Sequence, residues 1–227
     1  MAYSIIIPVL NEARALPDAL KSLQTARAQG AEIILVDGGS IDNTQGLAKK
    51  LEGKSFDKFA TSRPGRAVQM NVGAAMASNP LLVFLHIDTY LDESCCNALN
   101  EYSRSERIWG RFNVVLSGQN FLFRIIETMM NLRSRLTGVV TGDQVLFISR
   151  AFFREMGGFE ELPLMEDIEL SKRLRKIQWP VSSPVLVKTS SRRWEQYGIL
   201  KVIFIMWGLR LAYFLGVSPD KLVSYYE

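Results

Sequence analysis

The chain has 227 residues and a net charge of +4, with 27 Lys and Arg residues against 23 Asp and Glu residues. Hydrophobic residues make up 48% and charged residues 22%, which are globular proportions that exclude disorder for the bulk of the chain. The two signs of charge are interspersed, whereas a nucleic-acid-binding protein more often carries a concentrated basic stripe. We therefore expect no nucleic-acid partner, and the length favours a single domain.

The only two cysteines, Cys95 and Cys96, are adjacent in the sequence. Neighbouring cysteines rarely close a structural bridge, so a disulfide framework and a four-cysteine zinc site are both excluded. This cysteine usage predicts a reducing, cytoplasmic compartment.

Short apolar segments alternate with helical patterns over the first ninety residues. The predicted strands cover residues 4–9, 32–36, 56–60 and 81–86. The predicted helices cover residues 12–29, 42–51, with Asp42 as its N-cap, and 66–77. Continuous apolar strands separated by helices predict an α/β fold, with a mainly parallel central sheet and helices on both faces.

The second half is less regular, but it contains no repeat and no linker that would divide the chain. Further strands are predicted at residues 108–116, 144–149 and 184–187. Helices are predicted at residues 121–136, where the pattern is amphipathic, and at residues 166–177.

The segment 199–217 is almost entirely apolar and carries only two charges, Lys201 and Arg210. A membrane span needs about 20 mostly apolar residues, and a central arginine costs about 2.5–3.5 kcal/mol on insertion. Three interpretations remain open: a core or dimer helix, a helix lying on a membrane surface, and a true span.

Polar clusters stand where the predicted strands end. They comprise residues 11–12, 37–40, 63–66 and 86–89. Any one of them is explained by a turn or a helix cap, but ligands of open α/β sheets bind beyond the carboxyl ends of the strands. Four such clusters at one edge favour a binding site.

His86 and Asp88 are two residues apart in an extended segment, so their side chains point the same way. A carboxylate beside an imidazole suits Mg²⁺ or Mn²⁺ that also takes phosphate oxygens. The alternative is that His86 forms a local hydrogen bond and that Asp88 caps the next helix.

Five segments, in order, resemble the motifs of the family 2 inverting glycosyltransferases between residue 4 and about residue 176. They read IIPVLNE, ILVDGGSIDNT, GRAVQMNVGAA, FLHIDT and MEDIELSKRLRK, and SSRRWEQYG at residues 190–198 extends the likeness. The combination of HIDT, TGDQ and PLMED is similar to a small bacterial subgroup of that family.

The resemblance implies a GT-A fold, the nucleotide-sugar-binding α/β sandwich, in one glycosyltransferase domain over residues 1–227. Residues 1–90 would form the nucleotide-binding half, residues 91–198 the acceptor and catalytic half, and residues 199–217 an apolar helix. The donor would be a UDP- or GDP-sugar, and the cofactor a divalent metal ion, Mn²⁺ or Mg²⁺.

The resemblance also assigns roles to residues. Donor-binding positions are Pro8, Asn11, Glu12, Asp37, Gly39, Ser40, Arg66, Asn71 and His86. Asp88 would ligate the metal, and Asp167, paired with Glu166, would be the general base for the acceptor hydroxyl. Acceptor-binding positions are Gly142, Asp143, Gln144, Arg193 and Trp194, although the turn around Asp143 is equally compatible with a simple β-turn.

Two departures from the family pattern narrow the expectation. His86 replaces the first aspartate of the usual pair, and Ser190 replaces the glutamine of the motif found in processive synthases, so we do not expect a polymer synthase. The acceptor could be lipid-linked or belong to the cell envelope, with the protein peripheral on the inner face of the membrane or paired as a homodimer. The alternatives are a sugar-nucleotide-binding scaffold without turnover and a nucleotidyltransferase.

Overall fold

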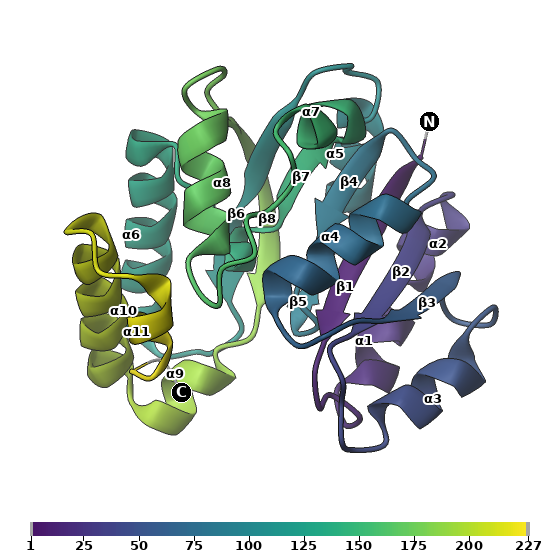
Figure 1. Cartoon of the computed structure of the whole chain (residues 1–227), viewed down its shortest axis with the longest axis horizontal. Coiled ribbons are helices and arrows are strands. Elements are labelled where there is room, and N and C mark those ends of the chain that lie inside the picture. The colour runs from purple at the N-terminus through teal and green to yellow at the C-terminus, as the bar shows by residue number, and fades with distance from the viewer. Residues whose placement is uncertain (1, 226–227) are drawn as a thin grey trace.

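Eight strands form one sheet in the order β3-β2-β1-β4-β7-β6-β8-β5 in the computed structural model, which describes residues 2–225 (Figure 1). The strands are β1 (Tyr3–Val9), β2 (Glu32–Asp37), β3 (Lys58–Thr61), β4 (Leu81–Phe84), β5 (Thr89–Tyr90), β6 (Trp109–Leu116), β7 (Leu146–Ser149) and β8 (Val181–Thr189). The first four strands pair in parallel. In the second half, β7 is antiparallel to β4 and β6, β8 is parallel to β6, and β5 is antiparallel to β8.

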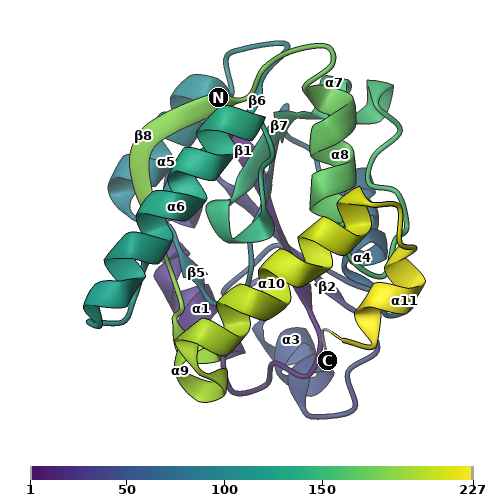
Figure 2. The ribbon, with the colours of Figure 1, turned by 90° about the vertical axis from the view of Figure 1, so that its left-hand side faces the viewer.

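Two layers of helices cover the sheet (Figures 1 and 2). The helices are α1 (Leu16–Ser22), α2 (Gln24–Ala28), α3 (Thr44–Leu51), α4 (Arg66–Met76), α5 (Glu93–Tyr102), α6 (Phe121–Thr137), α7 (Arg150–Glu155), α8 (Glu166–Leu174), α9 (Arg192–Tyr197), α10 (Ile199–Phe214) and α11 (Pro219–Val223), with a 3-10 turn η1 at Gly142–Gln144. The expected α/β class, with helices on both faces of the sheet, is confirmed.

The alternation of side chains along β1 builds two separate cores. Ile5 and Ile7 face one side, where they pack with residues of α1, α2 and α5. Ile6 faces the other side, where it packs with residues of α4, α7 and α8. Each of these isoleucines is fully buried, because a strand in the middle of a covered sheet meets a helix layer on both faces.

The predicted helix over residues 12–29 is instead a loop followed by two short helices. Pro17 stands in the first turn of α1, where its fixed φ and missing N–H are tolerated, and it restricts the residue before it. Residues 10–15 are thereby left outside the helix, beyond the carboxyl end of β1. The short strand β5 was not predicted, since two residues give no periodic pattern.

The apolar segment 199–217 forms α10, of which only Val202 and Leu209 are buried. Of the three interpretations left open for this segment, a helix buried in the core of the chain does not fit most of its length. Within residues 2–225, no helix combines the length and the apolar character that a membrane crossing requires.

Candidate active site

The strand register brings the predicted polar clusters to one edge of the sheet. Val9 at the end of β1 lies opposite Asp37 at the end of β2, and Asp37 lies opposite Thr61 at the end of β3. The strand β4 runs parallel to β1 on its other side, and His86 and Asp88 follow it. Parallel strands end at the same edge, so the loops that contain Asn11, Asp37 and Asp88 open on one side of the molecule.

The loops after β1 and β2 hold each other through hydrogen bonds. The backbone N–H of Asn11 donates to Ser40 Oγ at 2.8 Å, and the N–H of Ile41 donates to Asn11 Oδ1 at 2.9 Å. The N–H of Glu12 donates to Thr44 Oγ1 at 2.8 Å. Asp42, which was expected at the N-cap of α3, lies one residue before that position and accepts from the N–H of Thr44. These reciprocal bonds give the loop pair a defined shape without any ligand.

Asp37 is fully buried, and its own loop satisfies its carboxylate. Oδ1 accepts from the N–H groups of Gly39 and Ser40, each at 2.9 Å, and from Gln45 Nε2 at 2.8 Å. The hydroxyl of Ser40 donates to Oδ2. Asp37 therefore fixes the turn of Gly39 and Ser40, and the backbone of this turn lies at the edge of the sheet.

Gln69, which the sequence interpretation did not assign, fastens α4 to the ends of the first two strands. Its Nε2 donates to the carbonyl oxygens of Val9 at 2.8 Å and Val36 at 2.9 Å, and the residue is 4% exposed. A Cβ on Gly38 would lie 2.9 Å from the Gln69 side chain, so a larger residue there would displace the Gln69 amide. The available signal was a polar residue inside the apolar stripe of a predicted helix.

Three non-glycine residues of the described chain have positive φ, and each lies in a predicted motif or directly beside one. They are Asn11 with φ 56°, Val145 with φ 55° and Met165 with φ 70°. Asn11 is itself a predicted donor-binding residue, Val145 follows the predicted acceptor turn, and Met165 precedes the predicted catalytic pair. Such conformations cost of order 1–3 kcal/mol and concentrate at ligand sites.

Residues from four parts of the sequence meet beside this edge. Arg66 Nη1, at the start of α4, lies 3.9 Å from Glu166 Oε1, at the start of α8. The N–H of Gly142 donates to Asp167 Oδ2 at 3.1 Å, and His86 Nδ1 lies 3.6 Å from Asp143 Oδ1. The structure thus joins the predicted catalytic pair to predicted donor-binding and acceptor-binding residues around one small hollow of about 10 Å³.

The two neighbouring carboxylates of α8 differ in their surroundings. Glu166 is 5% exposed, and its burial, together with the adjacent charge of Asp167, raises its pKa in spite of Arg66 and His86. Asp167 is half-buried. The pair therefore combines one inward carboxyl with a raised pKa and one half-buried carboxyl that a substrate can reach.

Asp143 shows the opposite balance. Desolvation raises the pKa of its carboxyl, but the contact with His86 and the charges of Arg66 and Arg210 outweigh it, so the pKa lies below its usual range. Asp143 consequently remains an anion beside the imidazole of His86.

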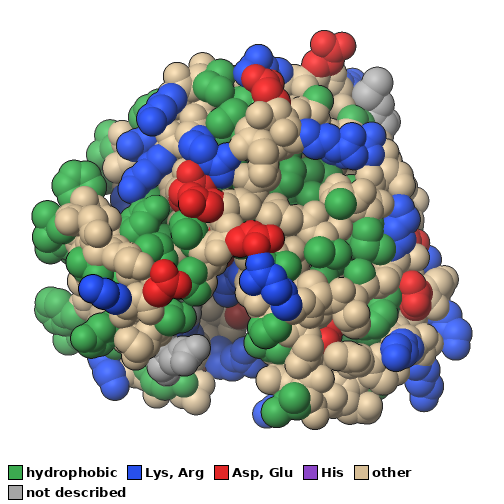
Figure 3. All heavy atoms as spheres, in the orientation of Figure 1, with side chains coloured by type: hydrophobic (Ala, Val, Ile, Leu, Met, Phe, Trp, Pro, Cys, Tyr) green, Lys and Arg blue, Asp and Glu red, His purple; other side chains and the backbone are tan. Residues whose placement is uncertain are grey.

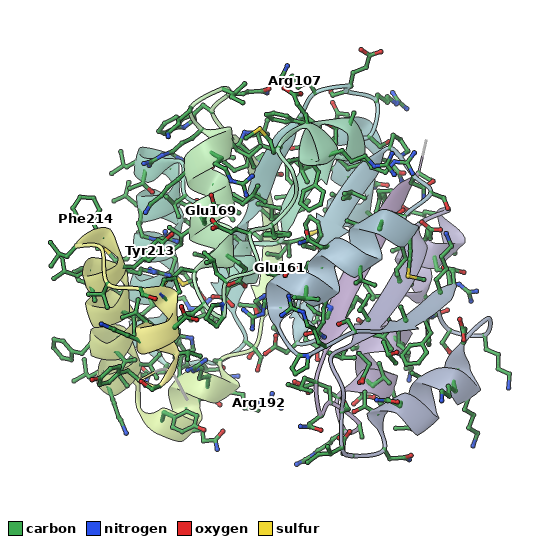
Figure 4. All side chains as sticks on the ribbon, in the orientation of Figure 1. Arg107, Glu161, Glu169, Arg192, Tyr213 and Phe214 are labelled. Carbon is green, nitrogen blue, oxygen red and sulfur yellow. The ribbon has the colours of Figure 1, made fainter. Side chains whose placement is uncertain are left out.

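Glu12 lies within electrostatic range of both Asp88 and Arg192. Burial raises the pKa of Glu12, Arg192 opposes this, and Asp88 adds to it. Arg192 belongs to α9, far along the chain, and projects from that helix toward the first half of the chain (Figure 4). The α9 segment thus brings a cation to the predicted donor and metal residues.

The residues present fit a metal ion that arrives with a diphosphate. No cluster of three His, Cys, Asp or Glu side chains able to hold an ion occurs in the described residues 2–225. Mg²⁺ in nucleotide sites usually binds through one or two carboxylates, with phosphates and waters as the remaining ligands. The half-buried Asp88, with Glu12 nearby, offers that donor set.

Four predicted site residues make other contacts. Asn71 exchanges two hydrogen bonds with the main chain of Phe159, at 2.9 and 3.0 Å. Gln144 is fully buried and lies 3.4 Å from Asn131 Oδ1. Trp194 packs against a cluster that includes Phe123 on α6. Pro8 is half-buried within β1. All four shape the elements around the edge of the sheet.

Two further cations that the sequence interpretation did not place in the site come from α6 and α10. Burial, helped by the charge of Arg210, lowers the pKa of Arg133 to about 10, although the charges of Asp167 and Asp143 oppose this shift. Arg210 was the unexplained charge of the apolar segment, and its position near Asp143 gives that charge an electrostatic partner.

A larger groove lies between the loop after β1 and the helices α9 and α10, with a volume of about 820 Å³. Four cations line it: Arg14, Arg192, Arg193 and Lys201. On the α10 side its wall is apolar and includes Val202, Ile205 and Met206. Arg193, a predicted acceptor-binding residue, therefore faces this groove.

The model of the family described as glycosyl transferase family 2 matches residues 4–154. A PGL/p-HBAD biosynthesis glycosyltransferase from Mycobacterium bovis is 32% identical over 127 residues, which cover 52% of this chain and 49% of the relative. A 4,4'-diaponeurosporenoate glycosyltransferase from Staphylococcus haemolyticus is 30% identical over 95 residues, 40% of this chain and 25% of the relative. The chain spans about half the length of the mycobacterial relative.

Solved structures share the fold at low sequence identity. TarS 1-349 from S. aureus superposes with a TM-score of 0.67 at 18% identity, covering 84% of this chain and 61% of that chain. The mannosyltransferase PcManGT from Pyrobaculum calidifontis, in complex with GDP-Man and Mn²⁺, gives a TM-score of 0.63 at 16% identity, covering 82% and 56%. These likenesses confirm the GT-A fold. By the match over most of its length, the chain belongs to glycosyl transferase family 2.

Proposed function

We propose that the protein transfers a sugar from a UDP- or GDP-sugar to an acceptor hydroxyl, with a divalent metal ion and with inversion at the anomeric carbon. The observation that carries the proposal is the meeting of Arg66, His86 and the Glu166–Asp167 pair beside the edge where Asp88 lies. Family membership supports the activity, and the complexes of TarS with UDP-GlcNAc and of PcManGT with GDP-Man and Mn²⁺ support the donor class and the metal.

Asp167 is the base in this proposal. Its carboxylate takes the proton of the acceptor hydroxyl while that oxygen attacks the anomeric carbon from the face opposite the diphosphate. The bond between the anomeric carbon and the phosphate oxygen breaks, and its electron pair leaves with the nucleoside diphosphate. Glu166 is too deeply buried to meet the acceptor directly, so its role is to position Arg66.

The leaving diphosphate requires positive charge. Asp88, with Glu12 nearby, would hold a Mn²⁺ or Mg²⁺ ion, which would neutralise the charge that develops on the phosphate oxygens. Arg66 and Arg192 reach the same edge from α4 and α9. We assign the loops of Asn11 and Gly39–Ser40 to the nucleoside, since their backbone is already fixed by mutual hydrogen bonds.

The acceptor that best fits the chain is an amphiphile with an anionic group, such as a lipid-linked or cell-envelope molecule. The 820 Å³ groove places four cations opposite an apolar wall of α10, which matches such a molecule. The protein would then act in the cytoplasm, peripheral on the inner face of the membrane. A homodimer through α10 is the competing arrangement.

The test is the release of nucleoside diphosphate from a panel of UDP- and GDP-sugars with Mn²⁺, using a bacterial lipid extract as the acceptor. Replacement of the base, Asp167→Asn, should slow transfer by about 10²–10⁴-fold. The exposed Glu161→Gln serves as the matched control and should leave the rate unchanged. The product should carry the anomeric configuration opposite to that of the donor. Full activity of Asp167→Asn would refute the base, and absence of release from every donor would refute the function.

A further inference from the structure

The outer face of α6 is apolar along its whole length. Its exposed residues Phe121, Ile125, Met129, Leu132 and Leu136 are each at least 47% exposed. They recur every three or four residues and so form one stripe. A second apolar stripe on the same helix, with Phe123 and Ile126, packs inward. The outer stripe therefore contributes nothing to the core.

Helix α10 repeats this arrangement. Leu200, Phe204, Trp207, Leu211 and Phe214 are each at least 60% exposed and also recur every three or four residues. Figure 4 shows Phe214 pointing away from the body of the molecule, while Tyr213 points toward α8, where its ring lies 4.2 Å from Lys172 Nζ. The exposed side chains are thus the residues of α10 that face away from the protein.

The two helices present one continuous surface, here named the α6–α10 face. Ile199 and Ile203 of α10 pack against the apolar cluster that contains Phe123 and Ile126 of α6. Figure 2 looks onto this side of the molecule and shows both helices at the front, and Figure 3 shows hydrophobic side chains gathered along the same flank. Contiguous apolar patches of this kind mark interaction sites.

The charges on these helices are almost all positive. Together they carry five cations, at Arg124, Arg133, Arg135, Lys201 and Arg210, and one acid, Glu127. Glu127 is 7% exposed and accepts the N–H of Leu116, so it is turned inward. The exposed charges at the α6–α10 face, which include Arg135 and Lys201, therefore have one sign.

We infer that the α6–α10 face docks on an anionic lipid bilayer, with both helices lying in the plane of the membrane surface. Apolar side chains of in-plane helices enter the boundary of the acyl chains while cations on their rim contact anionic head groups. If the α6–α10 faces of two copies packed together, their cations would meet across the dimer interface. Repulsion between these like charges disfavours a second copy as the occupant.

Docking in this orientation deepens the proposed function, and it rests on that function for the assignment of the basic groove to an amphiphilic acceptor. Lys201 belongs both to the rim of the α6–α10 face and to the basic groove, whose apolar wall is the neighbouring surface of α10. The groove would therefore open close to the bilayer, where an amphiphilic acceptor enters without leaving the lipid.

Flotation of the full chain with vesicles tests the docking. We expect binding to vesicles of phosphatidylglycerol and phosphatidylcholine, weak binding to phosphatidylcholine alone, and a blue shift of tryptophan emission as Trp207 leaves water. Each cation near an anionic surface contributes about fivefold to partitioning, so Arg135→Glu with Lys201→Glu should weaken binding at least about tenfold. Phe204→Ser with Trp207→Ser should also weaken it.

Matched controls lie on the far side of the molecule. Lys49→Glu with Lys50→Glu makes the same charge change on α3, and Ile41→Ser removes an apolar side chain that is 94% exposed. These variants should bind vesicles as the unaltered chain does. Equal binding by all variants, or no binding by the unaltered chain, would overturn the inference. A dimer in solution that Phe204→Ser with Trp207→Ser dissociates would assign the face to a second copy.

The two proposals fail separately. Vesicle binding needs no turnover, so Asp167→Asn should bind vesicles normally while it loses sugar transfer. Loss of docking with intact nucleotide binding would count against the α6–α10 face alone, and docking without nucleotide binding would count against the proposed function alone.

Discussion

A Cβ atom on residue 142 would lie 2.2 Å from Nε2 of His86, so Gly142 and the His86 ring are packed against each other without space for a side chain. Gly142 also donates its N–H to Asp167, and His86 faces Asp143. One glycine thereby sets the distance between the loop after β4 and the start of α8.

Gly142→Ala should displace the His86 ring and lower the rate of sugar transfer. The contact is at the end of the ring, so the loss of unfolding free energy should be at the low end for overpacking, about 1 kcal/mol. Urea unfolding and nucleotide release measure the two effects. Gly208→Ala is the control, since open space surrounds that position in α10, and it should leave activity intact. Unchanged activity in Gly142→Ala would show that the His86 position is not critical.

Gln69→Leu should destabilise the edge of the sheet. It removes the hydrogen bonds to the carbonyl oxygens of Val9 and Val36 in a buried position, for a cost of about 1–3 kcal/mol. Nucleotide affinity should fall as well, because these carbonyls precede the two donor loops. Urea unfolding and nucleotide titration check this, with the exposed Gln119→Leu as the control. Equal stability of the two variants would contradict the assignment.

Substitutions of Asn11 can separate the effect of backbone strain on stability from the effect of a hydrogen bond. Its φ of 56° is left-handed, and its Oδ1 accepts from Ile41. Asn11→Ala loses the hydrogen bond and keeps the strain of a positive φ. Asn11→Gly also loses the hydrogen bond but adopts a positive φ without strain, so the alanine variant should be less stable by about 1 kcal/mol. Thermal unfolding of the pair measures the difference. Equal stability would mean that the loop relaxes to negative φ.

The raised pKa of Glu166 should make the stability of the protein depend on pH. Its pKa is raised above the ordinary 4.5, so the folded state holds the proton more tightly than the unfolded state. Stability from this group is therefore present below pH 4.5 and is lost as pH rises toward the folded pKa. Glu166→Gln should remove that loss and be more stable relative to the unaltered chain at pH 8 than at pH 4. A urea series across pH measures it, and a pH-independent difference would contradict the raised pKa.

The first half of the fold follows from local sequence, because fully buried parallel strands such as residues 32–37 are continuous apolar runs. The antiparallel pairing of β7 with β4 and β6 depends on contacts far apart in sequence and leaves no local pattern. The sequence also could not decide where α10 lies, since an apolar helix has the same composition whether it faces a core or a membrane.

The candidate site was predictable where polar residues follow strands, as at Asn11 and Asp88. Gln69 was missed because a polar residue within the apolar stripe of a predicted helix marks a buried amide but does not reveal which backbone carbonyls it binds. Arg133 and Arg210 were missed because they reach the acids of η1 and α8 from helices remote in sequence.

The most direct test of the donor site is a thermal-shift titration with UDP and GDP, with and without Mn²⁺, on the unaltered chain and on Asp88→Asn. A ligand at 100 times its dissociation constant stabilises by about 2.7 kcal/mol. We predict a Mn²⁺-dependent shift with one nucleotide, lost in Asp88→Asn and retained in the exposed Asp18→Asn. A shift that is independent of Mn²⁺, or that survives in Asp88→Asn, would contradict the metal site, and no shift with either nucleotide would contradict the donor site itself.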